Sequence, residues 1–225
     1  MRRARRPARA AAAGVTLALL GVLPPLSAAA PPPPEESGRS QHLKLEARDY
    51  TLGRSDAPLT LVEFTDYQCP YCRRFQAQTF PLLKKNYIDT GQLRFVVRDL
   101  PLEFHSAARP AAEAAHCAGE QGKFWEMHQA LLGGEDALSE AGIDRRAHAV
   151  GLDLGRLHAC MKANRYEAAI AHNIATADGL GIRGTPAFFL GRMVQGTLEG
   201  EVAEGAIPWT DFDATLKELL AARQP

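Results

Sequence analysis

The 225-residue sequence is poor in several features that would assign a protein to a class at once. It contains only four cysteines and 7% aromatic residues, and its 26 Lys+Arg balance its 26 Asp+Glu. No internal repeat is visible, and the apolar run at residues 10–23 is shorter than the ~20 residues that a membrane-spanning helix needs. The composition argues against collagen, coiled coils, low-complexity disorder and multi-span membrane proteins, and favours a globular chain with a sizeable core.

The charge is unevenly distributed along the chain. Residues 1–30 contain five arginines and no acidic residue, so the rest of the chain carries 21 basic and 26 acidic residues. This mildly acidic body argues against nucleic acid or an anionic membrane as the main partner.

The N-terminal segment has the three parts of a secretory signal: a basic stretch at 2–9, an apolar stretch at 10–23 and small residues at 27–30. We therefore predict a signal peptide at 1–29, exported by the general rather than the twin-arginine route, with an uncleaved membrane anchor as the alternative. The proline-rich segment 30–43 is predicted to be a stiff spacer. The expected location is the periplasm or another extracytoplasmic space.

A strand–helix–strand unit opens the body of the chain. Residues 59–65 and 93–98 are predicted to be strands, and the amphipathic stretch 70–88 between them is predicted to be a helix kinked at Pro81. Such a unit pairs its strands in parallel through a helical crossover.

The pattern then changes to helices. Residues 105–180 are rich in Ala, Leu, Glu, His and Gln and are punctuated by glycines, which predicts several helices. Strand character returns at 187–190 and again between 193 and 206. A capping box at 210–213 is predicted to open a final helix. The sequence thus predicts an α/β layer interrupted by a helical stretch.

Cys69 and Cys72 form a C-x-x-C directly after a predicted strand and at the start of a predicted helix, which is the setting of a redox motif. Pro70 suits the first helical position and keeps its predecessor out of helical geometry. Free backbone N–H groups and the positive helix end stabilise a thiolate there. We therefore predict that Cys69 is the exposed nucleophile and Cys72 the shielded resolving thiol.

Three other uses of this motif remain open: a structural zinc half-site, a purely structural disulfide and a copper chaperone. The chain has no second C-x-x-C or well-spaced histidine pair to complete a zinc site. A structural disulfide rarely needs a strand–helix junction. Redox chemistry is the favoured interpretation.

Three segments, in the same order along the chain, resemble the DsbA-like branch of the thioredoxin superfamily. They are VEFTDYQCPYC at 62–72, KFWEMHQALL at 123–132 and GTPAFF at 184–189. The resemblance implies a thioredoxin fold with an inserted all-helical domain. The discontinuous thioredoxin-like domain would comprise 44–104 and 181–225, and the helical insertion 105–180.

The resemblance also implies roles for single residues. Cys69 matches the attacking cysteine and Cys72 its partner. Glu63 matches a buried acid that passes protons to and from Cys72, with a water-facing strand residue as the alternative. Thr185 and Pro186 match a substrate-binding loop in which the proline is cis.

The dipeptide between the cysteines, Pro70 and Tyr71, is expected to contact the substrate as well. DsbA itself has His where this chain has Tyr71, and a cationic or donating His beside the thiolate would favour the reduced form. With tyrosine we predict a milder reduction potential, about −130 to −220 mV on the scale of related proteins.

The other two cysteines, Cys117 and Cys160, lie 43 residues apart in the helical stretch. The simplest pairing in an exported chain with four cysteines joins them in a structural disulfide, worth ~4 kcal/mol by the chain-entropy model. His116 and His158 raise a Cys2His2 metal interpretation, but neighbouring positions on a helix point to different faces. A relay of electrons to the C-x-x-C pair is the remaining alternative.

The resemblance implies an exported thiol:disulfide oxidoreductase acting as an oxidase on cysteine-containing exported proteins. It implies reoxidation by a membrane partner of the DsbB or VKOR kind, with no metal or organic cofactor, no nucleic acid and a monomeric chain. A disulfide reductase is the first alternative, and an isomerase is disfavoured because the short spacer holds no dimerisation domain. A peptide-holding chaperone and a copper-binding module are the alternatives outside enzymes.

Overall fold

A computed structural model describes residues 40–134 and 138–222 of the chain. These residues belong to one compact unit, 38–225. The predicted signal peptide, 1–29, and most of the predicted spacer, 30–43, lie outside the described residues.

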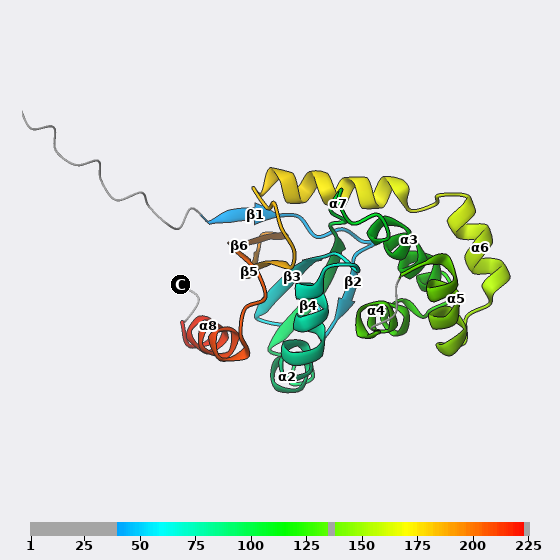
Figure 1. Ribbon diagram of the computed structural model, residues 1–225. Coiled ribbons are helices and arrows are strands. Elements are labelled where there is room, and N and C mark those ends of the chain that lie inside the picture. Colours follow the sequence, from blue (N-terminus) through cyan, green and yellow to red (C-terminus); the bar gives the residue numbers. More distant parts are fainter. Residues whose placement is uncertain (1–39, 135–137, 223–225) are drawn as a thin grey trace, which may run out of the picture. The chain divides into compact units, whose positions relative to one another are not determined.

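A six-stranded mixed sheet forms the centre of this unit (Figure 1). The strand order is β1-β6-β5-β3-β4-β2, and β3 and β4 are the parallel pair. The strands are β1 (Gln41–Leu43), β2 (Tyr50–Leu52), β3 (Leu59–Thr65), β4 (Leu93–Asp99), β5 (Ala187–Val194) and β6 (Thr197–Glu204).

The central strand β3 is buried at all seven positions. It pairs with β4 on one side and with β5 on the other, and helices cover both faces, so its side chains meet apolar neighbours in both directions. This is why buried and exposed positions do not alternate along β3, and why even Glu63 in its middle is buried. Both β3 and β4 form where the sequence predicts them.

The edge strand β1 starts at Gln41, inside the stretch that the sequence assigns to the spacer. Leu43 is buried against the sheet, and β1 pairs with β6 in antiparallel fashion. A three-residue strand is too short to show a period of two, so only its pairing identifies it.

The predicted helix at 70–88 is one helical stretch with two π-helical turns. Pro81 has no N–H to donate to the preceding turn, and the turn before it widens to the π form. The irregularity at Pro81 is therefore a π-helical turn rather than a simple kink. The segments are α1 (Pro70–Arg74), η1 (Phe75–Thr79), α2 (Phe80–Leu83) and η2 (Lys84–Ile88).

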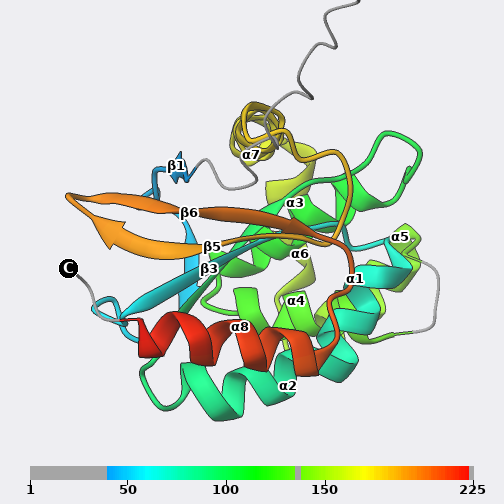
Figure 2. The same cartoon turned by 90° about the vertical axis from the view of Figure 1, so that its left-hand side faces the viewer.

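Among the described residues, five helices lie between β4 and β5, within the stretch predicted as an insertion. Figure 1 shows α3 to α6 beside the sheet and α7 running back along it. Ala177 of α7 packs with Val62 and Phe64 on one face of the sheet, whereas α1, α2 and α8 lie on the other face (Figure 2). The helices are α3 (Ala108–Gly119), α4 (Phe124–Gly133), α5 (Glu140–Ala149), α6 (Leu154–Lys162), α7 (Glu167–Gly179) and, after β6, α8 (Trp209–Ala221).

The capping box predicted at 210–213 does not form. Helix α8 begins at Trp209 after Pro208, which occupies the N-cap with φ −59°. The N-cap thus lies two residues before Thr210, at a proline whose ring fixes φ. Thr210 falls inside the first turn, and its hydroxyl lies 3.1 Å from the Asp211 carboxylate.

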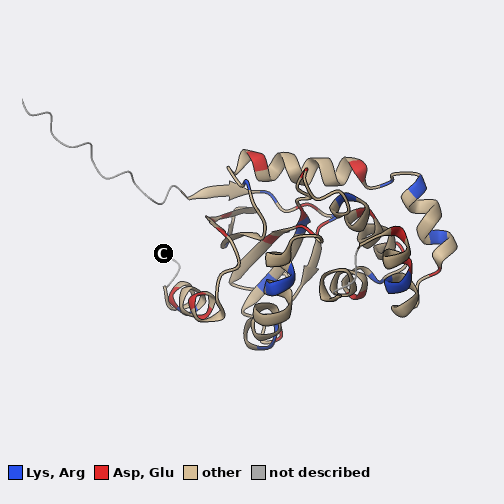
Figure 3. Ribbon diagram, in the orientation of Figure 1, with Lys and Arg blue, Asp and Glu red and all other residues tan. Residues whose placement is uncertain are grey.

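Charged residues of both signs are interspersed over the helices and connecting segments (Figure 3). Exposed pairs such as Arg109–Glu167 and Arg183–Asp178 combine opposite charges at 2.6 and 2.7 Å. Mixed charge of this kind keeps a surface solvated and contributes little to stability. The predicted α/β class, with one sheet and several helices, is confirmed.

Candidate active site

Cys69 occupies the N-cap of α1, immediately after the loop that leaves β3. Its backbone is extended (φ −69°, ψ 123°), and Pro70 takes the first helical position. This is the geometry that the proline predicts, because the ring favours helical φ for itself and extended geometry for its predecessor. Cys72 follows one turn later, and its side chain is fully buried.

The two thiols differ strongly in acidity. The pKa of Cys69 is lowered to about 5, chiefly by a hydrogen bond from the Cys72 thiol and further by Thr185 and the backbone N–H groups at the helix start. Burial is the main cause that raises the pKa of Cys72, and the Cys69 and Glu63 charges raise it further. In the reduced pair the negative charge therefore lies on Cys69 and the proton on Cys72.

Cys69 is not the exposed residue that the sequence predicts, because only 3% of its surface is accessible. The loop before β5 covers it, and its Sγ lies 3.3 Å from the carbonyl oxygen of Thr185. The exposed neighbour is Tyr71, with 52% of its surface accessible. Access to the sulfur therefore depends on how the Thr185 loop and Tyr71 lie around it.

The peptide bond between Thr185 and Pro186 is cis. Pro186 is buried and leads directly into β5, while the backbone of Thr185 faces the Cys69 sulfur. Residues separated by 116 positions thus meet at the sulfur.

Glu63 lies in the middle of β3 and is completely buried, which rules out the water-facing alternative. Desolvation raises its pKa to about 8, the nearby Thr65 hydroxyl lowers it, and the charge on Cys69 raises it again. A carboxyl group with such a pKa exchanges protons in the neutral range, as a proton carrier for Cys72 must.

Asp66 is a residue of the site that sequence reasoning missed. One of its carboxylate oxygens accepts hydrogen bonds from the N–H groups of Gln68 (2.7 Å) and Cys69 (3.1 Å). The other accepts from the N–H of Leu102 (2.8 Å) and lies 2.9 Å from Nδ1 of His105. The only available signal was an Asp three residues before the helix cap, a common turn former. Asp66 ties the nucleophile's backbone to the loop after β4.

Tyr67 and His128 were also missed. The Tyr67 hydroxyl lies 3.0 Å from Nδ1 of His128, and both side chains are buried. Desolvation lowers the pKa of His128 to about 4, so its ring is neutral near pH 7. The histidine lies within the 123–132 segment that carries the family resemblance.

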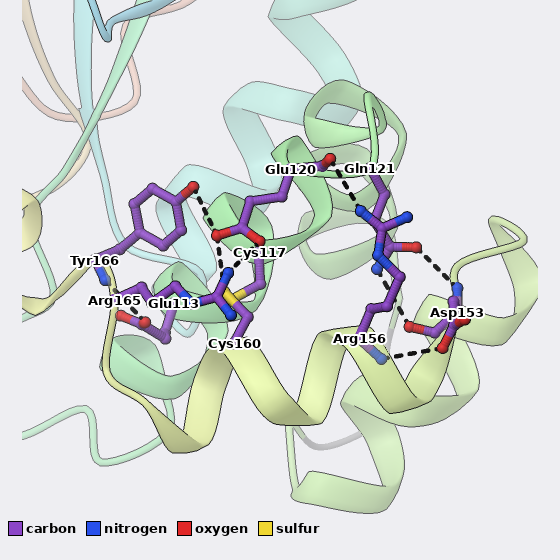
Figure 4. The surroundings of a disulfide bond; sticks show 9 residues. All are labelled: Glu113, Cys117, Glu120, Gln121, Asp153, Arg156, Cys160, Arg165 and Tyr166. Carbon is purple, nitrogen blue, oxygen red and sulfur yellow. Dashed lines mark hydrogen bonds and ion pairs between the residues drawn. A yellow bond between two sulfur atoms is a disulfide. The ribbon is translucent and has the colours of Figure 1, made fainter.

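A disulfide joins Cys117 of α3 to Cys160 of α6 (Figure 4), with an S–S distance of 2.02 Å. Glu113 and Glu120 lie beside it, and Glu120 pairs with Arg165 at 2.6 Å. Both sulfurs are bonded to each other, so these carboxylates and sulfurs do not form a thiolate ligand set.

His116 and His158, the two histidines of the Cys2His2 metal interpretation, each contact a carboxylate instead of a cysteine. His116 contacts Asp99 at 2.7 Å, and His158 contacts Asp144 at 2.7 Å. Each imidazole pairs with a separate carboxylate, so neither is free to join the cysteines in one ligand set.

Comparison with known proteins assigns the chain to a family. The family model described as "Thioredoxin" matches residues 46–218. The chain belongs to the thioredoxin family. A thioredoxin-like oxidoreductase from Silicibacter pomeroyi DSS-3 is similar to it, with 31% identity and a TM-score of 0.67 over 79% of this chain and 95% of that one. Wolbachia pipientis alpha-DsbA1 shares the fold, with 24% identity and a TM-score of 0.70 over 79% and 93%.

Among curated proteins, the thioredoxin-family chain matches the Na(+)/H(+) antiporter NhaA 3 of Salinispora tropica. The two are 40% identical over 162 residues, which make up 71% of this chain and 24% of the antiporter. The chain thus spans about a quarter of the length of the curated relatives that it matches.

The family model and these structural matches confirm the predicted thioredoxin fold, which the chain shares with a DsbA protein. Among the helices in 40–134 and 138–222 of this thioredoxin-family chain, we find none whose length and apolarity would suffice to cross a membrane.

Proposed function

We propose that the chain is an extracytoplasmic oxidase that donates a Cys69–Cys72 disulfide to cysteine-containing exported proteins. The observation that carries this proposal is the unequal acidity of the two thiols, a Cys69 pKa of about 5 beside a raised Cys72 pKa. A thiolate that persists at neutral pH stabilises the reduced form. A stabilised reduced form makes the corresponding disulfide the stronger oxidant.

The reaction follows from which sulfur bears the charge. A substrate thiolate attacks Cys69 of the disulfide, the S–S bond breaks, and Cys72 leaves as a thiolate that takes the proton of Glu63. A second substrate thiolate then attacks the substrate sulfur of the mixed disulfide, and Cys69 leaves as its stabilised thiolate. The substrate loses two electrons and gains a disulfide, and the enzyme ends reduced.

Four residues around Cys69 are assigned to substrate binding. Thr185 and Pro186 would pair with the substrate backbone, as the resemblance implies, and Pro70 and Tyr71 would contact the side chains beside the substrate cysteine. The exposure of Tyr71 and the position of the Thr185 carbonyl beside the Cys69 sulfur support this assignment.

The remaining parts of the proposal concern the cellular context. Residues 1–29 would act as the export signal, and a quinone-linked membrane partner of the DsbB or VKOR kind would reoxidise the enzyme. The thioredoxin-like domain would comprise 44–104 and 181–225, with 105–180 as the insertion, and the chain would act as a monomer. The cycle uses only two sulfurs and one carboxyl group.

The deciding experiment is the equilibrium reduction potential of the Cys69–Cys72 pair, from glutathione titration with thiol trapping and mass mapping. A value of about −120 to −180 mV is expected for a disulfide donor. A value near −270 mV, about that of thioredoxin, would replace the oxidase with a reductase. If Cys69→Ser retained the full function of the protein, peptide holding rather than disulfide exchange would be that function, which would indicate a chaperone. Tight stoichiometric binding of Cu(I) by the reduced protein would indicate a copper-delivery protein.

A further inference from the structure

Cys72 is a poor leaving group because of where it lies. Its side chain is fully buried, and burial is the main cause that raises the pKa of its thiol. A thiol with a higher pKa leaves a disulfide more slowly, because negative charge develops on the departing sulfur. Burying such a charge without a hydrogen-bond donor costs free energy. A group that receives this charge at Cys72 Sγ would therefore speed the exchange reaction.

The main-chain N–H of Asp66 is such a donor. Asp66 follows the last residue of β3, and its N–H donates to Cys72 Sγ across 3.5 Å, a length that suits the large sulfur atom. Burial raises the pKa of Cys72, and this N–H lowers it. A donor that already points to the place where charge develops stabilises a transition state without reorganisation during the reaction.

The side chain of Asp66 fixes the position of this N–H. One carboxylate oxygen accepts hydrogen bonds from the N–H groups of Gln68 and Cys69. The other accepts from the N–H of Leu102 and lies 2.9 Å from Nδ1 of His105. The carboxylate has no accessible surface. It therefore anchors the backbone of Asp66 both to the start of α1 and to the segment after β4.

We propose that Asp66 assists the cleavage of the Cys69–Cys72 bond. Its main-chain N–H receives the negative charge that develops on Cys72 Sγ, which makes Asp66 a catalytic residue, and its carboxylate holds this N–H in place. The proposal rests on the thiol–disulfide exchange proposed above. It does not depend on the net direction, because the Cys69–Cys72 bond is broken in the cycle of an oxidase and in that of a reductase.

The electron pair of the broken bond moves to Cys72. A substrate thiolate forms a bond to Cys69 Sγ, the Cys69–Cys72 bond breaks, and Cys72 Sγ becomes a thiolate beside the Asp66 N–H. This thiolate then takes the proton of Glu63, as described above. Asp66 itself neither gains nor loses a proton, since its N–H is a fixed donor and its carboxylate keeps its hydrogen bonds throughout.

The first test is the rate at which dithiothreitol reduces the oxidised full-length protein, followed by stopped flow at pH 7. In Asp66→Asn the amide oxygen can still hold the start of α1. The new NH2 group faces the N–H of Leu102, so two donors meet and the anchor to the segment after β4 is lost. We expect the rate to fall about tenfold, because a displaced donor loses much of its effect.

The sign of this change separates two roles of Asp66. Removing a carboxylate near a developing thiolate favours the thiolate, so a role of the negative charge alone predicts a faster reaction in Asp66→Asn. The proposed anchor predicts a slower one. A rate equal to or above that of wild type would overturn the proposal.

A second reaction separates the two cysteines. In the Cys72→Ser background, dithiothreitol cleaves a mixed disulfide between Cys69 and glutathione, and no charge develops on a sulfur at position 72. Adding Asp66→Asn should leave the rate of this cleavage almost unchanged. A similar slowing in this reaction would show that Asp66 acts through Cys69 or through the fold, and would overturn the proposal.

The matched control variant is Asp49→Asn, the same chemical change in the segment before β2. The Asp49 side chain is also buried, accepts the N–H of Glu46 at 2.7 Å and pairs with Arg98 at 2.8 Å. This variant should lose stability and keep the wild-type rate of disulfide reduction. A rate as slow as that of Asp66→Asn would assign the effect to destabilisation and overturn the proposal.

Replacing the N–H itself is the most direct test. An ester in place of the Thr65–Asp66 peptide bond removes this donor and keeps every side chain, and the segment that carries it can be joined to the rest of the chain by native ligation at Cys69. The ester protein should be slowed at least as much as Asp66→Asn, because the donor is absent rather than displaced. A wild-type rate would overturn the proposal. These assays measure rates with dithiothreitol, so a thioredoxin-like potential would overturn the oxidase proposal and leave them intact.

Discussion

Cys69 and Cys72 face each other across one turn at the start of α1, whereas Cys117 and Cys160 join two separate helices, α3 and α6. The first pair lies beside free backbone N–H groups that stabilise a thiolate. The second pair lies beside carboxylates, with one oxygen of Glu113 within 4.8 Å of both sulfurs. Negative charge there opposes both an attacking thiolate and a leaving one. Two disulfide-forming pairs in one chain are thus given opposite reactivity by their electrostatic surroundings.

The largest effect is expected from substitutions in the reactive pair, Cys69 and Cys72. Cys69→Ser should abolish disulfide exchange, because the sulfur that substrates attack is gone. Cys72→Ser should instead trap mixed disulfides at Cys69, since no resolving thiol remains. Non-reducing gels and mass mapping after incubation with a peptide that contains a disulfide read out both, because the Cys69 thiolate can attack that disulfide and expel a thiolate. Turnover by Cys69→Ser at the wild-type rate would contradict the assignment.

Removing the second pair should have the complementary effect. The double variant Cys117→Ala/Cys160→Ala should lose about 4 kcal/mol of unfolding free energy, from a closed loop of 43 residues. Its exchange rate should remain within about twofold of wild type, because no step of the reaction uses these sulfurs. Denaturant titration gives the first quantity and a dithiothreitol assay the second. Loss of exchange in a folded double variant would revive the electron-relay alternative.

The pH dependence of stability should also distinguish the pairs. Cys69 titrates near 5 in the folded reduced protein and near 9 when unfolded, so the unfolded state binds more protons between these values. The reduced form should therefore gain stability over the oxidised form as pH rises from 5 to 9. The gain is at most ~1.4 kcal/mol per pH unit, less where solvent screens the sulfur.

Comparing the two redox forms in the same buffers cancels every group whose pKa is the same in both. Glu63 is an exception, because the Cys69 charge that raises its pKa exists only in the reduced form. Cys117 and Cys160 stay bonded throughout and contribute nothing to the difference. Denaturant titrations at pH 5, 7 and 9 measure it. A difference that does not grow with pH would mean that Cys69 is not acidic and would remove the main support for the oxidase.

The sequence predicts those parts of the site that depend on neighbours in the chain. Pro70 places Cys69 at the helix start, and the strand-forming residues of β3 place a strand before it, so the acidity of the nucleophile follows from local rules. Glu63 on that strand is harder, because the pattern of a strand buried on both faces does not reveal where a given side chain points.

The parts that escaped prediction arise from contacts distant in sequence. The burial of Cys69 comes from Thr185, 116 residues later, and no local pattern at Cys69 contains that information. Asp66 and His128 are single polar residues whose partners lie on other elements. The contact between Asp99 and His116 depends likewise on a strand and a helix that are separated in the sequence.

The smallest expected effect tests the protection of the second pair. Glu120 places a carboxylate oxygen 3.5 Å from Sγ of Cys160 and also pairs with Arg165. In Glu120→Gln the negative charge is gone and the arginine cation is left beside the sulfur, so both changes favour an approaching thiolate. A charge at this distance is worth ~1 kcal/mol in a water-like medium, about a fivefold faster reduction of Cys117–Cys160 by dithiothreitol. Mass mapping of the alkylated cysteines measures that rate separately from the rate at Cys69–Cys72, which should not change. Equal rates for wild type and variant at Cys117–Cys160 would mean that burial of the sulfurs, rather than charge, keeps this disulfide inert.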